Sequence, residues 1–287
     1  MNSQPHTVVK GPLKTDREAV IALHARCNAA DNIDIPLFLD MIPERVAAEA
    51  SAGFYENGEL VGFALLPVNP GPEATIFVHP EHRRLGIGTA LLDAMRAVAR
   101  ARGLKRFIVV TDAASASGTA FLAATGASYG ESEYLLLLDP NRLDRSPRKY
   151  PDLVLRPAGL DDVDTLIHVQ SAAFGADQTL VHEAVLRAVA DDRRRYHLGV
   201  LSGKPIGLLR TSIWDEEADV TAFGVVPTHQ GRGYGRQMLR DAIDLLVAAG
   251  QERITIEVAT DNENALGLYQ SCGFDVIAKF DYYDLTA

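Results

Sequence analysis

Two segments of this 287-residue chain combine a polar side chain with closely spaced glycines. The first glycine loop reads Arg83-Arg84-Leu85-Gly86-Ile87-Gly88, and the second reads Gln230-Gly231-Arg232-Gly233-Tyr234-Gly235. Each lies between an expected strand and an expected helix. Glycines there remove Cβ atoms, so consecutive backbone N–H groups can surround an anion, and a helix N-terminus adds partial positive charge. The pattern predicts a diphosphate site.

The two loops belong to a longer internal repeat. Five positions, Pro80, Gly86, Gly88, Gly103 and Gly126, recur 147 residues later as Pro227, Gly233, Gly235, Gly250 and Gly273. Because glycine and proline mark positions with special backbone angles, a constant offset indicates the same chain path twice. We therefore predict a tandem duplication. Two loops in register also favour anion binding over helix starts that use glycine only for close packing.

Other motifs with related chemistry do not fit. The dinucleotide fingerprint Gly-x-Gly-x-x-Gly fails because Leu91 and Met238 stand at its third glycine. The segment 126–130 reads Gly-x-Ser-x-Gly, but a helix is expected before it and a strand after it, the reverse of a nucleophile elbow.

With both loops in place, the sequence resembles the GCN5-related N-acetyltransferase (GNAT) superfamily, whose Gln/Arg-x-x-Gly-x-Gly/Ala loop binds the pyrophosphate of acetyl-CoA. The resemblance covers nearly the whole chain as two copies, in a layout similar to that of the tandem mycothiol synthases. The second copy also has a later element of the family, Asn262-x-x-Ala265-x-x-Leu268-Tyr269-x-x-x-Gly273-Phe274. Acetyl-CoA is the cosubstrate that this resemblance implies.

The resemblance also implies site residues. Asn262 is expected beside the pantetheine arm and Tyr269 near the cofactor sulfur, where its phenol, with a pKa of about 10, is protonated at pH 7 and can protonate the departing thiolate. The residues implied to contact the cofactor in the second copy are Phe223, Gly224, Val225, Gln230, Gly231, Arg232, Gly233, Tyr234, Gly235, Arg236, Asn262 and Ala265. Those in the first copy are Val78, Arg83, Gly86, Gly88 and Thr89.

The first copy departs from the family pattern at the later element. With the offset of 147 residues, Asn262 corresponds to Ser115, Tyr269 to Leu122 and Phe274 to Ala127. Leu122 cannot donate a proton. The first copy is therefore predicted to be catalytically degenerate, although its loop could still hold acetyl-CoA, and we interpret it as a structural partner of the second.

An acceptor amine must lose a proton before or during attack, and two carboxylates are candidates for accepting it. Glu257 lies in an apolar strand with its side chain opposite Ile256 and Val258. Asp219 begins the preceding strand, near an acidic residue of the mycothiol synthases. Each has a plainer alternative: Glu257 as a strand-edge partner of Arg253, and Asp219 as part of a solvated turn with Asp215, Glu216 and Glu217. Tyr269, too, could be only a packing residue of an amphipathic helix.

Periodicity predicts the elements that position these residues. The fold class is α/β, with two tandem GNAT-like domains, each a mixed and mostly antiparallel sheet flanked by helices. In the second copy we expect strands at 153–156, 196–201, 206–213, 220–226, 254–258 and 280–285, and helices at 161–174, 179–190, 233–249 and 265–271. In the first we expect a hairpin around Asn57-Gly58, strands at 75–78 and 107–110, and a helix at 86–102.

The segment between the copies is rich in proline and charge. We place an N-terminal domain at 1–140, a linker at 141–151 and a C-terminal, catalytic domain at 152–287, because such a stretch has little to bury and cannot hold a regular ladder.

The composition of the chain narrows the classes of partner that the protein is expected to bind. A formal net charge of −10 disfavours nucleic acid, which is bound through clustered Lys and Arg. Two cysteines, Cys27 and Cys272, are too few for a disulfide framework, and no metal site is expected. Residues 1–10 lack a signal-peptide pattern and no apolar run is long enough to span a membrane, so we expect a cytoplasmic protein. We take it to be a monomer or homodimer, although no feature of the sequence decides between them.

The combined prediction is an acetyl-CoA-dependent N-acetyltransferase in which a primary amine of a small molecule or peptide attacks directly, without a covalent enzyme intermediate. Three alternatives remain open at this point: a mycothiol-synthase-like amino-sugar acetyltransferase, a protein N-terminal or lysine acetyltransferase, and a non-catalytic acyl-CoA-binding regulatory module.

Overall fold

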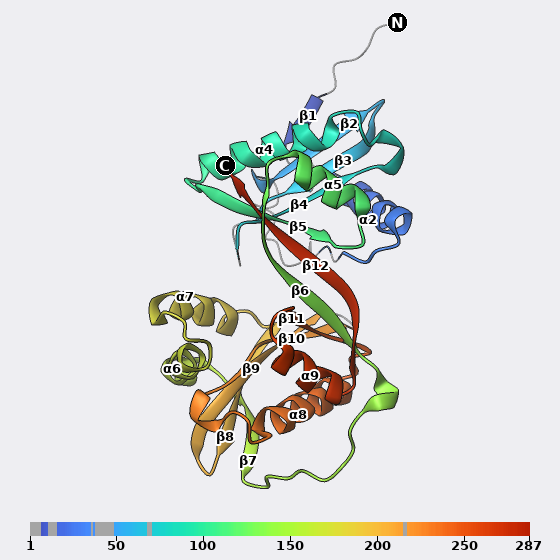
Figure 1. Cartoon of the computed structure of the whole chain (residues 1–287). Coiled ribbons are helices and arrows are strands. Elements are labelled where there is room, and N and C mark those ends of the chain that lie inside the picture. The colour runs from blue at the N-terminus through green and yellow to red at the C-terminus, as the bar shows by residue number, and fades with distance from the viewer. Residues whose placement is uncertain (1–6, 11–15, 36, 38–48, 68–70, 215–216) are drawn as a thin grey trace, which may run out of the picture. The chain divides into compact units, whose positions relative to one another are not determined.

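The computed structural model describes residues 7–10, 16–35, 37, 49–67, 71–214 and 217–287. They form two compact units. One contains the described residues up to Glu133 together with Ala278–Ala287, and the other contains Tyr134–Ile277. Each unit is a sheet with helices on both faces, which confirms the predicted mixed α/β class (Figure 1).

The first unit is built on strands in the order β1-β2-β3-β4-β5-β12. Within the described part of this unit, β4 and β5 pair in parallel and the other neighbouring strands are antiparallel. Its elements are β1 (Thr7–Lys10), α2 (Arg17–Asp31), β2 (Ser51–Glu56), β3 (Glu59–Leu65), β4 (Glu73–Val78), α4 (Ile87–Ala101), β5 (Arg106–Asp112) and α5 (Ala116–Ala124). Helix α2 packs on one face through Val20 and Leu23, and α4 packs on the other through Leu91 and Met95.

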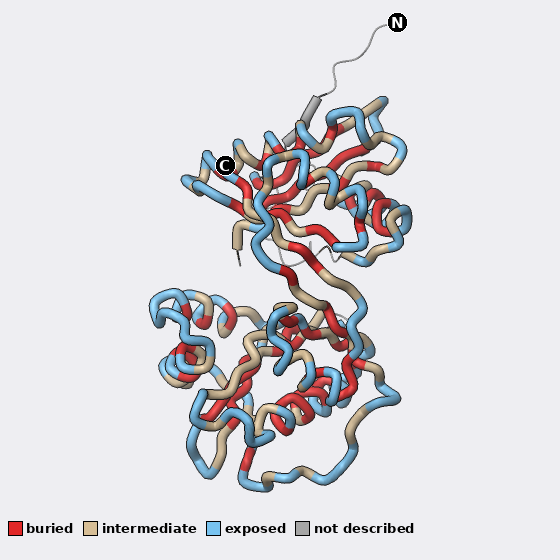
Figure 2. Tube along the Cα trace, in the orientation of Figure 1, coloured by how far each residue is buried: buried red, intermediate tan, exposed pale blue. Residues whose placement is uncertain are grey.

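The second unit repeats this arrangement with the order β6-β11-β10-β9-β8-β7. Helices α6 and α7 cover one face of its sheet, and α8 and α9 cover the other (Figure 1). Its elements are β7 (Leu153–Ala158), α6 (Val163–Phe174), α7 (Gln178–Val189), β8 (Arg194–Leu201), β9 (Lys204–Trp214), β10 (Glu217–Val225), α8 (Tyr234–Ala248), β11 (Arg253–Ala259) and α9 (Glu263–Ser271). The buried residues follow the strands and the inner sides of the helices (Figure 2).

Two strands belong to both units. β6 (Ser128–Leu138) contributes Leu136 and Leu138 to the core of the second unit, whereas β12 (Phe274–Thr286) contributes Leu285 to the core of the first. Residues Phe280–Thr286 pair with β5 in antiparallel register. The C-terminal strand of the second sequence copy therefore completes the sheet of the first unit. The linker that we placed at residues 141–151 concerns the two copies of the sequence repeat, and it stays a prediction.

The segment 141–151 has more structure than its composition suggested. Arg148 bonds Asp241 on α8, with Nε and Oδ1 2.5 Å apart, and Arg240 of α8 bonds Asp144, with Nη1 and Oδ2 3.0 Å apart. Charged residues in this segment therefore hold it against the helix that follows the second glycine loop. Within the described residues, no helix is long and apolar enough to cross a membrane.

Candidate active site

The candidate site begins where two parallel strands of the second unit stop pairing. Residues Glu217–Val220 of β10 pair with Arg253–Ile256 of β11, and no later pair between these strands is found in the described residues. Both strands nevertheless run on, β10 to Val225 and β11 to Ala259. Backbone N–H and C=O groups on the facing edges are thus available to hydrogen-bond an extended ligand that adds to the sheet like another strand.

A bulge in β10 shapes the same place. The register with β9 shifts between Thr221 and Gly224, and Ala222 has a φ of 47°, unusual for a residue with a side chain. Ala222 packs on the α6 side, so the bulge turns Phe223 to the α8 and α9 side. A Cβ at Gly224 would lie 2.9 Å from that of Ala173, at the end of α6, which explains the glycine.

The second glycine loop follows this strand and leads into α8. Gly231 and Gly233 have φ values of 71° and 89°, a region that only glycine enters without strain. The Gln230 side chain donates to the carbonyl of Val225, with Nε2 and O 2.8 Å apart, and so ties the loop to the strand. No side chain caps α8, which leaves its first N–H groups for another acceptor. This geometry suits a diphosphate.

Tyr269 lies on α9, beside the bulge. The side chain of Asn262 caps this helix by accepting from the N–H of Ala265 at 3.1 Å. The Tyr269 ring stacks on Phe223, with ring centres 6.1 Å apart, and contacts Phe274. Burial raises the pKa of Tyr269 to about 12, so the phenol stays protonated at neutral pH. No hydrogen bond to its hydroxyl is found among the described residues, so the hydroxyl is free to act as a donor.

The two candidate carboxylates lie on the other face of the sheet. Ala218, Val220, Ile256 and Val258 are buried under α8, so Asp219 and Glu257, which alternate with them, point to the α6 side. Burial raises the pKa of Asp219, against the opposing effects of hydrogen bonds from Ser212 and the charge of Arg210.

The two carboxylates differ in their surroundings. The Oδ1 atom of Asp219 is buried without a hydrogen-bond partner, which is inconsistent with a fully solvated turn, whereas Glu257 is exposed. Asp215 and Glu216, which we considered part of such a turn, lie outside the described residues. Arg253, the alternative partner of Glu257, pairs with Glu217, with Nε and Oε1 3.5 Å apart. The phenol of Tyr269, on α9, and the carboxylate of Asp219, on β10, thus lie on opposite faces of the sheet, near the point where the pairing of β10 and β11 ends.

Sequence reasoning missed one residue of this site, Tyr150. Its hydroxyl donates to the carbonyl of Arg232, and its ring packs on Tyr234 with ring centres 4.6 Å apart. An aromatic residue within an otherwise charged, proline-rich segment was the available signal, because such a side chain usually finds an apolar surface to cover.

The first glycine loop has the same backbone but different surroundings. Gly86 and Arg84 have φ values of 82° and 66°, and α4 likewise starts without a side-chain cap. However, the described pairs between β4 and β3, over Thr75–Val78, show no register shift and so no bulge. Leu122, at the place of Tyr269, is buried.

The carboxylate of Asp31 also bridges two segments of the first unit. Its Oδ1 lies 2.7 Å from Nη1 of Arg83 in the loop. Its Oδ2 accepts from the hydroxyls of Ser115 and Ser117 at the start of α5, both at 2.9 Å. Burial alone would raise the pKa of Asp31, but these hydrogen bonds from Arg83, Ser115 and Ser117 leave it below its usual value. A charged bridge thus joins the loop after β4 to the segment after β5. In the second unit, the corresponding Gln230 and Asn262 bond to their own loops.

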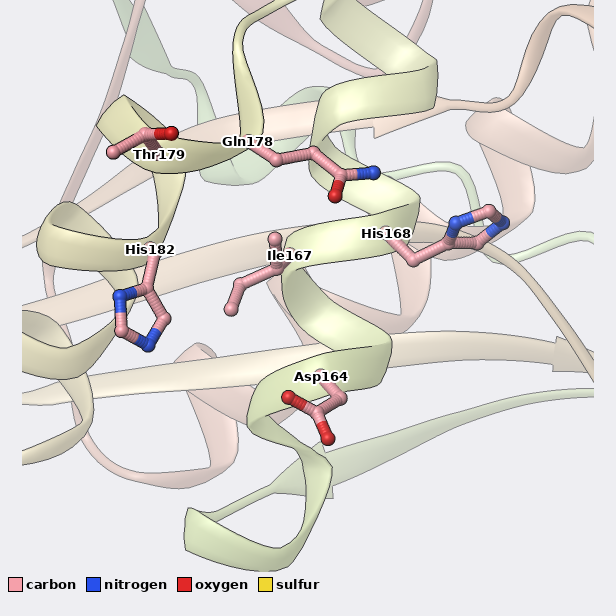
Figure 3. Close-up of a pocket in the computed structure, with 6 residues that line it drawn as sticks. All are labelled: Asp164, Ile167, His168, Gln178, Thr179 and His182. Atoms are coloured by element: carbon pink, nitrogen blue, oxygen red, sulfur yellow. The ribbon is translucent and has the colours of Figure 1, made fainter.

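A cavity of about 420 Å³ between α6 and α7 is a separate feature (Figure 3). Its lining contains no residue of the glycine loop or of α9. Ile167 lies between the helices, and His168 and His182 lie to either side of it, so their rings do not converge on a common point. Within the described residues, no cluster of His, Cys, Asp and Glu could hold a metal ion.

The sequence and the fold of this chain both match those of known acetyltransferases. The sequence model of the Acetyltransferase (GNAT) family matches residues 18–126 and 164–274. A mycothiol acetyltransferase of Kineococcus radiotolerans is 30% identical over 294 residues, which cover 93% of each chain. A second relative with that name, from Streptomyces coelicolor, is 28% identical over 76% of this chain and 74% of its own.

Solved structures show the same fold. A GCN5-related N-acetyltransferase from Sphaerobacter thermophilus has a TM-score of 0.80 at 17% identity and covers 99% of this chain and 97% of its own. A tandem GNAT protein from the clavulanic acid biosynthesis pathway has a TM-score of 0.73 at 18% identity, covering 98% of each chain.

Proposed function

This chain belongs to the GNAT acetyltransferase family, and on that premise we propose that its second copy transfers an acetyl group from acetyl-CoA to a primary amine by direct attack. The observation that carries the proposal is the presence of three features in one unit: a helix after a glycine loop that no side chain caps, a strand edge without a partner among the described residues, and the phenol of Tyr269 beside that strand. Within the family, acetyl-CoA supplies an activated acyl group as a thioester.

The residues present suit that cosubstrate. The N–H groups at the start of α8, together with Gly231 and Gly233, would hold the diphosphate, and the nearby Arg232 and Arg236 add positive charge. Phe223, Gly224 and Val225 offer the strand edge to the amide-bearing pantetheine arm. Asn262 and Ala265 begin the helix that carries Tyr269 to the sulfur.

Proton movements divide between the two faces. Asp219 accepts a proton from the acceptor ammonium, so that the amine nitrogen can form a bond to the acyl carbon. After the attack the nitrogen releases its second proton to solvent as the amide forms. Tyr269 donates its proton to the sulfur as the carbon–sulfur bond breaks and regains one from solvent. We favour Asp219 over Glu257 because its carboxylate is buried and has an oxygen without a partner.

The names of the relatives described above suggest a more specific acceptor. Two are named mycothiol acetyltransferases, so a second, more specific candidate substrate is the amine form of mycothiol that lacks the acetyl group. Acetyl-CoA-dependent thiol release should be measured with this compound, with simple amino sugars and with N-terminal and lysine peptides. Release with one class identifies the acceptor. Binding of acetyl-CoA without release in any class would instead favour the non-catalytic module.

Asp219→Asn is expected to lower kcat/KM by about 10²-fold at neutral pH, because the acceptor ammonium loses its proton acceptor. In the wild type, burial raises the pKa of Asp219, so kcat/KM should fall as the pH drops through that raised pKa, above the pH at which an exposed aspartate titrates. The pH profile of kcat/KM checks this. The variant should lose the acidic limb, Glu257→Gln should keep it, and an unchanged profile in Asp219→Asn would rule out this role.

We also propose that the first copy is catalytically silent and holds no cofactor of its own, because the Asp31 bridge joins its loop to the start of α5 and Leu122 replaces the phenol. Gly86→Val should therefore leave turnover within a few-fold of the wild type, and calorimetry should count one acetyl-CoA per chain. A dead Gly86→Val enzyme that still folds, or two bound cofactors, would contradict this.

A further inference from the structure

Tyr150 lies outside both sequence copies' motifs, yet its side chain contacts the second glycine loop. Two hydrogen bonds to Gln237 fix the backbone of Tyr150. The N–H of Tyr150 donates to Oε1 of Gln237 at 2.9 Å, and Nε2 of Gln237 donates back to the carbonyl of Tyr150 at 2.7 Å. Gln237 is buried on the first turns of α8. This pair of bonds anchors Tyr150 to the helix that the loop begins.

From that anchor the side chain reaches the loop. The Tyr150 ring packs on Tyr234, and its hydroxyl donates to the carbonyl of Arg232. A Cβ at Gly233 would lie 3.6 Å from this hydroxyl, so Tyr150 covers one side of the Arg232–Gly233 peptide. In a planar trans peptide the C=O and the following N–H point in opposite directions. Holding the carbonyl of Arg232 toward Tyr150 therefore turns the N–H of Gly233 away from it.

We propose that Tyr150 is a positioning residue that presents the N–H groups of the second glycine loop to the diphosphate of acetyl-CoA. The inference rests on the proposed function and adds a residue to it. A flanking glycine on each side of Arg232 gives this stretch wide backbone freedom, so the peptide needs an external hold if its N–H is to be aimed before the ligand arrives. The Tyr150 hydroxyl is such a hold, and it acts through the carbonyl of Arg232.

Tyr150→Phe separates this role from simple packing, because phenylalanine keeps the ring against Tyr234 and removes only the hydroxyl. Loss of one neutral hydrogen bond predicts a Kd for acetyl-CoA about 5-fold higher, with kcat at saturating acetyl-CoA unchanged. The decisive comparison uses S-acetylpantetheine, an acyl donor without the diphosphate. Its kcat/KM should be the same in the variant and the wild type. Tyr129→Phe, which removes a hydroxyl bonded to Ser132 in the first unit, is the matched control and should change neither donor.

Two results would overturn the inference: an unchanged Kd for acetyl-CoA in Tyr150→Phe, or an equal loss with both donors, which would indicate general damage to the unit. A wild-type enzyme that uses acetyl-CoA and S-acetylpantetheine equally well would instead remove the diphosphate site itself, and the proposed cofactor arrangement with it. If only the role of Tyr150 is wrong, the wild type still prefers acetyl-CoA to S-acetylpantetheine. If the diphosphate site is wrong, the wild type shows no such preference.

Discussion

Tyr269→Phe is expected to lower kcat by about 10²–10⁴-fold while leaving the Kd for acetyl-CoA nearly unchanged. The phenol is the proton donor at the sulfur in this account, and phenylalanine keeps the ring stacked on Phe223 while removing only the hydroxyl. The loss corresponds to about 3–5 kcal/mol of transition-state stabilisation. Single-turnover rates of thiol release, measured beside calorimetric binding of acetyl-CoA, separate the chemical step from binding.

The hydroxyl of Tyr269 has no partner among the described residues, so its removal leaves no buried group unsatisfied, and the variant should unfold at nearly the wild-type temperature. A second substitution controls for position: Tyr134→Phe removes a phenol that packs on the same core from β6 and should keep full activity. Wild-type kcat in Tyr269→Phe would remove this residue from the mechanism.

Gly233→Val is expected to abolish acetyl-CoA binding. Gly233 has a φ of 89°, and a β-branched residue cannot adopt it without strain, so the loop must rearrange and its N–H groups lose their common direction. A Cβ at Gly233 would make ordinary contact with Tyr150, 3.6 Å from its hydroxyl, so the expected loss comes from the backbone strain and not from a clash of the Cβ. Calorimetry with acetyl-CoA measures it.

The matched control for that substitution is Gly250→Val, which imposes the same strain, at a φ of 84°, just beyond the other end of α8. Both variants should be less stable than the wild type, but only Gly233→Val should fail to bind acetyl-CoA. Acetyl-CoA bound by folded Gly233→Val with wild-type affinity would show that the diphosphate lies elsewhere.

Local signals in the sequence were sufficient to predict much of this site. The paired glycines located the loops, because a φ near 80° demands glycine, and the apolar periodicity located α8 to within one residue at each end. The alternation in β11 correctly set Glu257 opposite Ile256. In each case the determinant lies within a few residues of the feature.

Features that depend on distant partners were not predictable. The bulge at Ala222 reflects a register with β9, and Gly224 beside it is explained by the close approach of Ala173, so this glycine does not by itself indicate a bulge. Strand β12 joins the sheet of the first unit because Phe280–Thr286 pair with β5, which lies more than 160 residues earlier in the sequence. The Asp31 bridge joins α2 to segments more than 50 residues away, and a carboxylate ending a helix carries no local signature of such a role.

The central claim is that one end of acetyl-CoA binds to the N–H groups ahead of α8 and the other end brings its sulfur to Tyr269. A crystal structure of the protein with coenzyme A tests it most directly. The account predicts the diphosphate against residues 231–235 and the sulfur within hydrogen-bond distance of the Tyr269 hydroxyl. Coenzyme A bound at the first glycine loop alone, or a sulfur far from that hydroxyl, would contradict it.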